Sequence, residues 1–315
     1  MRLLIIGLGA VGCAYGHALR EAGHDVVHLP RRRPAGARAA VRFRLLDGRR
    51  APAEGRSVSY QPEVVATPKD AGPVDLALLA VRTADFRLAA DRVRALPGQP
   101  LALVLGEWWS DRAMLDEHLG ERGWLLGRPE AGGRLGTEES LLALRPTLTL
   151  GEQPAIGPAT RARVTELFAS GGIATRWQPE AIHALWLHHA ITGAIGGAAH
   201  RVGGFDALLA DTGHRRECAV CIREALAVCA ARSVPLERFE EGHLAFAPAP
   251  LLADHLAALW TADPVTRAIT RLRALDADAR ACFDDVWLAA RRLGLQTPAL
   301  DRCRPHVAAP PGAAA

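Results

Sequence analysis

Leu3-Leu4-Ile5-Ile6-Gly7-Leu8-Gly9-Ala10-Val11-Gly12 is the stretch that decides the fold of this chain. Its first four residues form an apolar run with the branched side chains of a buried parallel strand. Residues 13–22 have the composition of a helix, Gly23 supplies a helix stop, and Asp25–Leu29 forms a second apolar run. A strand, a glycine-rich turn, a helix and a strand within about 30 residues predict a dinucleotide-binding unit. A glycine-rich turn in an ordinary α/β fold is the less favoured alternative.

Each glycine of the turn has a physical reason to be there. The first allows a tight turn, the second lets the backbone approach a pyrophosphate, and the third lets the helix pack closely on the strand. The helix N-terminus then presents free N–H groups and its positive dipole end to the phosphates. The residues predicted to bind the cofactor in this turn are Gly7, Leu8, Gly9, Ala10, Val11 and Gly12.

The end of the second strand indicates which dinucleotide is bound. NAD enzymes usually have Asp or Glu there to accept a hydrogen bond from the ribose 2′-hydroxyl. This chain has Pro30-Arg31-Arg32-Arg33 instead. Because a guanidinium can bind a 2′-phosphate through two parallel hydrogen bonds, we expect NADP(H) as the cofactor. A solvated basic turn is the alternative.

Composition limits the class of protein. The chain has 315 residues, 49% of them hydrophobic and 23% charged, enough for two domains of about 150 residues each. No apolar run reaches the ~18 residues of a membrane span, and the N-terminus reads as a core strand, so we expect a cytoplasmic protein with no membrane partner. The net charge of +4, without a basic stripe interleaved with aromatic residues, argues against nucleic acid.

Cysteine spacing offers one candidate metal or redox site. Cys218 and Cys221 form a CxxC within a segment of helical composition. A metal site would need a second pair or suitably spaced histidines. We therefore expect these thiols to pack in a core, and we predict no metal site.

The order of apolar segments predicts the architecture. Strand and helix signals alternate up to about residue 151, which is typical of a doubly wound parallel sheet. From Pro158 onward strand signals nearly vanish and helices follow one another. We predict an α/β protein with an NADP-binding Rossmann domain over residues 1–157 and an all-helical substrate and dimerisation domain over 158–307. A disordered tail is predicted over 308–315.

The chain resembles the ketopantoate reductase (2-dehydropantoate 2-reductase) family. The glycine-rich turn, Ala22-Gly23-His24-Asp25-Val26, Asp75-Leu76-Ala77-Leu78-Leu79-Ala80-Val81-Arg82 and Gly294-Leu295-Gln296-Thr297-Pro298 match segments of that family. The resemblance implies that Arg31 binds the 2′-phosphate and that Arg82 replaces a family Lys near the same group. We also expect a small-molecule substrate and a homodimer.

The positions that carry chemistry in the family differ here. Gly106 stands where the family has an Asn that reaches nicotinamide and substrate, and it is counted among the cofactor-binding positions. His188 stands in place of the catalytic Lys, and Thr192 in place of a substrate-binding Asn. Thr266 and Asp278 replace a Ser and a Glu. The candidate catalytic residues are therefore His188, Asp278, Thr266 and Thr192.

These replacements shape the functional hypotheses. A carbonyl reductase needs an acid to protonate the oxygen, and an imidazolium at His188 could serve because imidazole titrates near neutral pH. Lys69 is the only Lys in the chain. Trp108 and Trp109 indicate a wider, more apolar pocket than a small keto acid needs, although a lid, a dimer contact or core packing stays open.

Three functions follow from these residues. The leading hypothesis is an NADPH-dependent reductase of a C=O or C=N group on a substrate other than, and larger than, ketopantoate. The second is an NADP(H)-binding sensor or scaffold of the same fold without hydride transfer. The third is a ketopantoate reductase with His in place of Lys.

Overall fold

The computed structural model describes residues 1–31, 40–50, 55–120, 123–136, 140–153 and 155–308. The chain forms two compact units, Met1–Ile182 and His183–Ala315. The first contains the Rossmann sheet, and the second is built from helices in its described residues. The predicted fold class is therefore confirmed.

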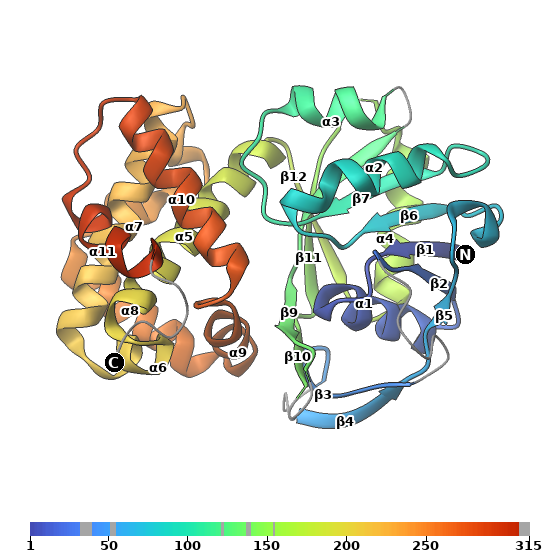
Figure 1. Ribbon diagram of the computed structural model, residues 1–315, viewed down its shortest axis with the longest axis horizontal. Helices are drawn as coiled ribbons and strands as arrows, with labels where there is room; N and C mark the ends of the chain where they lie inside the picture. The colour runs from blue at the N-terminus through green and yellow to red at the C-terminus, as the bar shows by residue number, and fades with distance from the viewer. Residues whose placement is uncertain (32–39, 51–54, 121–122, 137–139, 154, 309–315) are drawn as a thin grey trace. The chain divides into compact units, whose positions relative to one another are not determined.

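Eight strands form the main sheet of the first unit, in the order β12-β11-β8-β7-β6-β1-β2-β5 (Figure 1). From β8 to β5 all neighbouring strands are parallel, whereas β11 runs antiparallel to β8 and β12 runs parallel to β11. The strands are β1 (Arg2–Ile6), β2 (Asp25–Leu29), β5 (Glu63–Val64), β6 (Leu76–Leu79), β7 (Leu101–Leu105), β8 (Trp124–Arg128), β11 (Thr147–Gly151) and β12 (Ala174–Gln178).

The strand order reverses at β1. The chain goes from β1 to β2 on one side and then returns to β6 on the other side. In doubly wound sheets the crevice beyond the carboxyl ends of the strands at such a reversal is where ligands bind. Leu3, Leu4 and Ile5 of β1 are fully buried, so the strand that carries the glycine-rich turn lies at the centre of the core.

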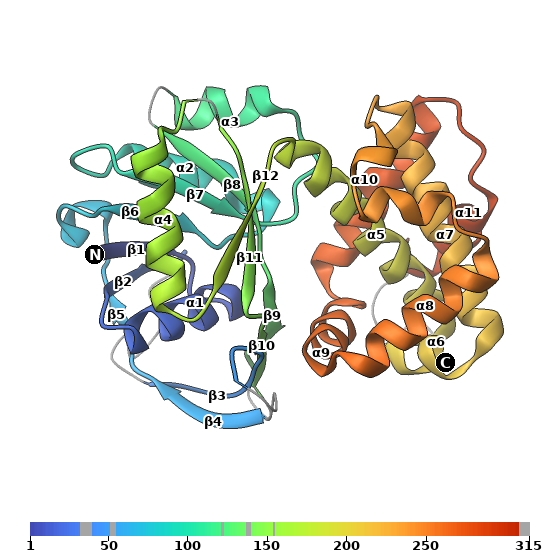
Figure 2. The same cartoon turned by 180° about the vertical axis from the view of Figure 1, so that it is seen from behind.

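Helices cover both faces of the main sheet. The helices α2 (Phe86–Arg94) and α3 (Arg112–Leu119) lie over the face turned to the viewer in Figure 1. The helices α1 (Ala10–Glu21) and α4 (Pro158–Ser170) lie over the face seen in Figure 2. Tyr15 of α1 meets Phe168 of α4 edge to face, with ring centroids 6.1 Å apart.

A second, smaller sheet packs against α1. Its strands are β4 (Gly55–Tyr60), β3 (Val41–Asp47), β10 (Leu141–Leu144) and β9 (Ala131–Arg134), in that order. Leu45 of β3 and Leu142 of β10 are fully buried in the same core cluster as Tyr15. The sheet therefore fixes α1 from the side opposite the main sheet.

The second unit is formed by helices. These are α5 (Ala181–Val202, which begins at the end of the first unit), α6 (Phe205–Ala210), α7 (Thr212–Ala231), α8 (Ala249–Ala262), α9 (Pro264–Arg273), α10 (Ala277–Arg292) and α11 (Pro298–Ala308). Gly193, Gly196 and Gly197 of α5 let α10 approach closely, since a Cβ on Gly193 would lie 2.7 Å from the carbonyl carbon of Cys282. Cys218 and Cys221 are fully buried in α7, as expected for packing thiols. Within the described ranges, no helix combines the length and apolar composition needed to cross a bilayer.

Two boundaries differ from the sequence prediction. The first unit extends past residue 157 because α4 packs on the Rossmann core and β12 continues the main sheet. The half-exposed pattern of Ala174–Gln178 hides that strand from a hydrophobicity argument. Within the predicted helical domain, residues 264–292 form two helices, α9 and α10, because Asp276 caps a new helix start. Residues 309–315 of the predicted tail lie outside the described residues, and α11 extends to Ala308.

Candidate functional site

A cavity of about 340 Å³ opens at the carboxyl ends of β1 and β6. Its lining includes three residues of the glycine-rich turn, Gly7, Leu8 and Gly9, together with Arg31 and Arg82, which were expected near the 2′-phosphate, and also Arg92. The structure thus brings the turn together with the two arginines that the sequence analysis selected, at the strand-order reversal where α/β proteins bind ligands.

The three glycines of the turn are not equivalent. Gly7 has φ +122°, and a Cβ there would lie 2.4 Å from the carbonyl oxygen of Ala80. A Cβ on Gly12 would lie 2.6 Å from the carbonyl oxygen of Gly7. Gly9 has φ −87°, which any residue adopts, and apart from its own chain neighbours no described residue has an atom within 4 Å of the position its Cβ would take. Close backbone contacts therefore require glycine at positions 7 and 12, whereas no contact among the described residues requires it at position 9.

The start of α1 suits an anion. The helix begins at Ala10 with Gly9 as its N-cap, no described side chain caps it, and its first turn holds no acidic residue. The backbone N–H groups of a helix's first turn lack partners within the helix. A phosphate at this end would accept those hydrogen bonds and interact favourably with the helix dipole.

The basic end of the cavity is organised around Asp85. Arg31 donates to the Asp85 carboxylate at 3.1 Å, and Arg82 lies 3.5 Å from its other oxygen. Arg92 donates to the carbonyl oxygens of Pro30 and Arg31 at 3.0 and 3.1 Å, which fixes the backbone where β2 ends. Two guanidiniums therefore already converge on one anionic group. Arg32 and Arg33 lie outside the described residues.

Gly106 follows β7 directly. A Cβ at this position would lie 3.3 Å from the carbonyl oxygen of Val81, a residue of the cavity lining. Gly106 therefore lies next to the cavity wall, and it offers no side chain to a ligand.

Trp108 belongs to the core. It is 1% exposed and meets Phe86 of α2 edge to face, with ring centroids 5.0 Å apart and an interplanar angle of 83°. The prediction that this indole widens a substrate pocket is therefore wrong. The large ring packs against α2 instead. Trp109 is partly exposed.

Two candidate catalytic residues share one face of α5. His188 and Thr192 are four residues apart, so they lie one above the other, and both are partly exposed. Asp278 lies in the first turn of α10, beside Ala279, whose Cβ would be 2.9 Å from a Cβ on Gly196. With a rise of 1.5 Å per residue, Gly196 is roughly 12 Å along α5 from His188. The structure therefore pairs His188 with Thr192 and places Asp278 near the α5 surface about two turns away.

Thr266 has a structural partner. Its hydroxyl donates to the Asp263 carboxylate at 2.6 Å, and the same carboxylate accepts from the backbone N–H groups of Val265 and Thr266. This arrangement caps the start of α9. The hydroxyl that the resemblance placed in the active site thus holds a helix end.

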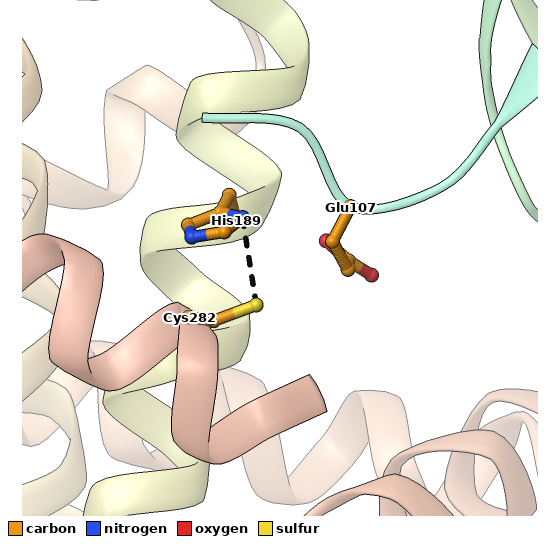
Figure 3. A group of neighbouring side chains, drawn as sticks. All are labelled: Glu107, His189 and Cys282. Carbon is orange, nitrogen blue, oxygen red and sulfur yellow. Dashed lines mark hydrogen bonds between the residues drawn. The ribbon is translucent and has the colours of Figure 1, made fainter. Parts of the chain in front are cut away.

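His189 is a buried histidine with polar neighbours that the sequence analysis did not select as a candidate site residue. It is 2% exposed, with Nδ1 3.5 Å from the Cys282 sulfur and Nε2 3.2 Å from the Asp285 carboxylate. Figure 3 shows His189 of α5 and Cys282 of α10 pointing toward each other. A signal was present in the sequence, because His189 lies one helical turn before Gly193 and shares the face that the small residues mark as packed.

Comparisons with known proteins agree with this geometry. Residues 3–107 match the family model of ketopantoate reductase PanE/ApbA. The fold is similar to that of 2-dehydropantoate 2-reductase from Geobacter metallireducens GS-15 (18% identity, 98% of this chain and 99% of that chain, TM-score 0.73). It is also similar to D-mandelate dehydrogenase in complex with NADH and anilino(oxo)acetate (14% identity, 98% of this chain and 97% of that chain, TM-score 0.70). A dimeric ketopantoate reductase from Staphylococcus aureus is a third similar structure (15% identity, 98% of this chain and 97% of that chain, TM-score 0.68).

No curated protein sequence matches the chain. The suspected resemblance is nonetheless confirmed: residues 3–107 carry the sequence signature of the ketopantoate reductase family, and the whole chain has the fold of structures solved under that name.

Proposed function

We propose that this protein is an NADPH-dependent reductase of a C=O or C=N group on a substrate larger than ketopantoate. The observation that carries the proposal is the open space at Gly9, beside a helix N-terminus and two converging arginines. A pyrophosphate fits the first two features, and a 2′-phosphate fits the third.

The cofactor preference rests on Arg31 and Arg82. A 2′-phosphate would take the place that the Asp85 carboxylate now holds between the two guanidiniums. Because the phosphate carries more charge and three acceptor oxygens, it can compete with one carboxylate for both arginines. NADPH should therefore bind at least about tenfold more tightly than NADH, which is about 1.4 kcal/mol.

A calorimetric titration tests this preference. Arg31→Ala should remove most of the difference between NADPH and NADH while leaving the NADH dissociation constant close to the wild-type value. Arg163→Ala, which removes an exposed ion pair with Asp75 on the same unit, is the matched control. Equal affinities of the wild type for the two nucleotides would refute the NADPH assignment.

The proposed chemistry assigns roles to the residues of α5 and α10. A bound nicotinamide supplies a hydride to the substrate carbon. His188 as imidazolium donates the proton to the oxygen or nitrogen, and the Thr192 hydroxyl, one turn away, hydrogen-bonds to the substrate. Asp278 binds a hydroxyl of the substrate or of the nicotinamide ribose. The proposal gives Thr266 no role in the proton path, since its hydroxyl already donates to the Asp263 carboxylate.

The substrate class is argued from two differences. Gly106 leaves room where the family has an Asn, and a His at position 188 is shorter than a Lys. D-mandelate dehydrogenase, which shares the fold, was solved with anilino(oxo)acetate, a 2-oxo acid that bears an aromatic ring. A bulky, partly apolar 2-oxo acid or imine is therefore the first class to test.

NADPH oxidation over a panel of oxo acids, ketones and imines is the direct assay. His188→Gln should lower turnover by about 100-fold while the NADPH dissociation constant stays near wild type, since general acid catalysis contributes about 10²–10⁴-fold. A rate that is indifferent to His188→Gln would remove His188 from the mechanism.

A second function has one observation in its favour. Gly106 and His188 replace both family groups that contact the reacting atoms, whereas the nucleotide cavity is retained. An NADP(H)-binding sensor or scaffold would show this combination. Tight NADPH binding without turnover on any compound of the panel would favour it. The homodimer remains a prediction, consistent with the dimeric Staphylococcus aureus reductase.

A further inference from the structure

His28, the fourth residue of β2, lies fully buried beneath the glycine-rich turn. Its Nδ1 is 3.0 Å from the carbonyl oxygen of Gly7, and its Nε2 is 2.7 Å from the hydroxyl of Tyr60 on β4. One imidazole therefore joins the first glycine of the turn to the small sheet on the other side of α1.

The partners decide which nitrogen carries the proton. A carbonyl oxygen can only accept, so Nδ1–H donates to Gly7. Nε2 is then an acceptor, and the Tyr60 hydroxyl donates to it. Burial lowers the pKa of His28 to about 4, so the ring is neutral at physiological pH. The two hydrogen bonds therefore run in one direction, from Tyr60 through His28 to Gly7.

The orientation of the Gly7 carbonyl matters for the cavity. In a planar trans peptide the C=O of one residue and the N–H of the next point in opposite directions. A Gly7 carbonyl held toward His28 therefore directs the N–H of Leu8 away from His28. Gly7 and Leu8 both line the cavity.

We propose that His28 is a positioning residue for dinucleotide binding, which orients the Gly7–Leu8 peptide, and that Tyr60 locks the His28 tautomer. The sequence of α1 makes room for this pair. A Cβ on Gly16 would lie 2.7 Å from both His28 Nε2 and the Tyr60 hydroxyl. Gly16 lies outside the phosphate turn, and its role is to let the imidazole and the phenol meet under the helix.

This inference rests on the proposed dinucleotide binding and deepens it. It makes a separate claim, because the glycine-rich turn that contains the Gly7–Leu8 peptide is proposed to bind the pyrophosphate, and NADPH and NADH both contain that group. Loss of the hydrogen bond from His28 to Gly7 should weaken the binding of both nucleotides by the same factor, so the ratio of their dissociation constants stays unchanged. Loss of Arg31 should change the ratio. The two ideas can therefore fail independently.

The experiment compares three substitutions in the full chain. His28→Leu removes both hydrogen bonds, and we expect the dissociation constants of NADPH and NADH to rise about tenfold, or about 1.4 kcal/mol. His28→Asn places an amide N–H near the position of Nδ1–H, and it should restore affinity to within about threefold of wild type. Tyr60→Phe keeps the imidazole but removes the tautomer lock, so an intermediate loss of about threefold is expected.

A matched control separates positioning from stability. Val26→Ala lies on the same strand, is 2% exposed and has no polar partner to lose. It should lower the melting temperature as His28→Leu does while leaving both dissociation constants unchanged, with titrations run well below the transition.

Two results would overturn the inference. One is unchanged nucleotide affinity in folded His28→Leu, and the other is equal weakening in His28→Leu and His28→Asn at similar melting temperatures. A wild-type protein that binds neither nucleotide would refute the proposed function itself, and this inference with it.

Discussion

The glycines of α5 and Gly9 of the turn after β1 differ in what surrounds the position of the absent Cβ. In α5 the neighbouring helix takes the space: a Cβ on Gly193 would lie 2.7 Å from Cys282, and one on Gly197 would lie 2.5 Å from the Phe283 ring. In the turn, apart from the chain neighbours of Gly9, no described residue has an atom within 4 Å of that position. A glycine whose space is filled indicates packing. Open space alone does not indicate a ligand, because Gly157 is equally open; what distinguishes Gly9 is its position at a helix N-terminus in the lining of a cavity with two arginines.

Gly9→Val should have the largest effect on binding and almost none on folding. The φ of −87° and ψ of −170° at Gly9 suit a β-branched residue, so unfolding free energy should change by less than about 1 kcal/mol. NADPH affinity should fall at least about 1,000-fold, or about 4 kcal/mol, because the side chain fills the pyrophosphate space. Gly157→Val, at the N-cap of α4 and equally open, is the control that should bind normally. Wild-type affinity in Gly9→Val would show that the turn is not the site.

Gly193→Ala should show the opposite behaviour. Its methyl group would meet backbone atoms of Cys282 and Phe283 at 2.7 to 2.8 Å, and the two helices would have to move apart. We expect a loss of about 3 kcal/mol in unfolding free energy despite the better helix propensity of Ala. Chemical denaturation followed by circular dichroism measures it. An unchanged midpoint would mean that α5 and α10 are not in close contact.

Acid should weaken both regions through one histidine in each. Burial lowers the pKa of His28, beneath the turn, to about 4. Burial and the neighbouring Arg280 lower that of His200, on α5, to about 4 as well. Both groups bind protons more readily when unfolded, so stability is full above about pH 6.5 and falls as the pH drops toward 4.

For His28 the loss approaches about 3 kcal/mol. Denaturation midpoints between pH 7 and 4 should decline less steeply in His28→Asn than in wild type, and His200→Asn should remove a separate part of the slope. Parallel profiles for wild type and His28→Asn would contradict the burial of a neutral imidazole.

Gly16→Ala should give the smallest effect. Its space is filled by neighbouring atoms, as in α5, but those atoms belong to His28 and Tyr60, the pair proposed to position the turn. The new methyl group would displace His28 and Tyr60, while Ala improves helix propensity by about 1 kcal/mol. We expect a net loss of about 1 kcal/mol in stability and about threefold in NADPH affinity. Adding Tyr60→Phe should recover part of the stability loss, because the hydroxyl that the methyl group meets is gone. Additive losses in the double variant would exclude that contact.

The sequence was most informative where local pattern and chemistry coincide. The glycine-rich turn between two apolar runs was sufficient to predict β1, α1 and β2, and Arg31 and Arg82 line the same cavity as the turn. Periodicity over a short window carries this information, because the whole motif lies within one supersecondary unit.

Sequence reasoning was less successful where a residue's role depends on a distant partner. Trp108 is buried because Phe86 lies beside it. Thr266 matches the family spacing, but its hydroxyl donates a hydrogen bond to the Asp263 carboxylate. His189 was passed over in favour of its neighbour, since its contact with Cys282 joins two helices that are far apart in the chain. Composition does not encode such pairings, and only the packed structure reveals them.

The parallel pairing of β3 with β10 also bears on the order of folding. Leu45 pairs with Leu142, so the small sheet closes only after most of the first unit has been synthesised. Contacts between such distant segments form slowly, because a long loop must be closed before they yield any gain. Tyr60 is the last residue of β4, which pairs with β3 in the small sheet. The glycine-rich turn precedes β10 by about 130 residues in the chain, so the hydrogen bonds behind the turn depend on a sheet that closes late.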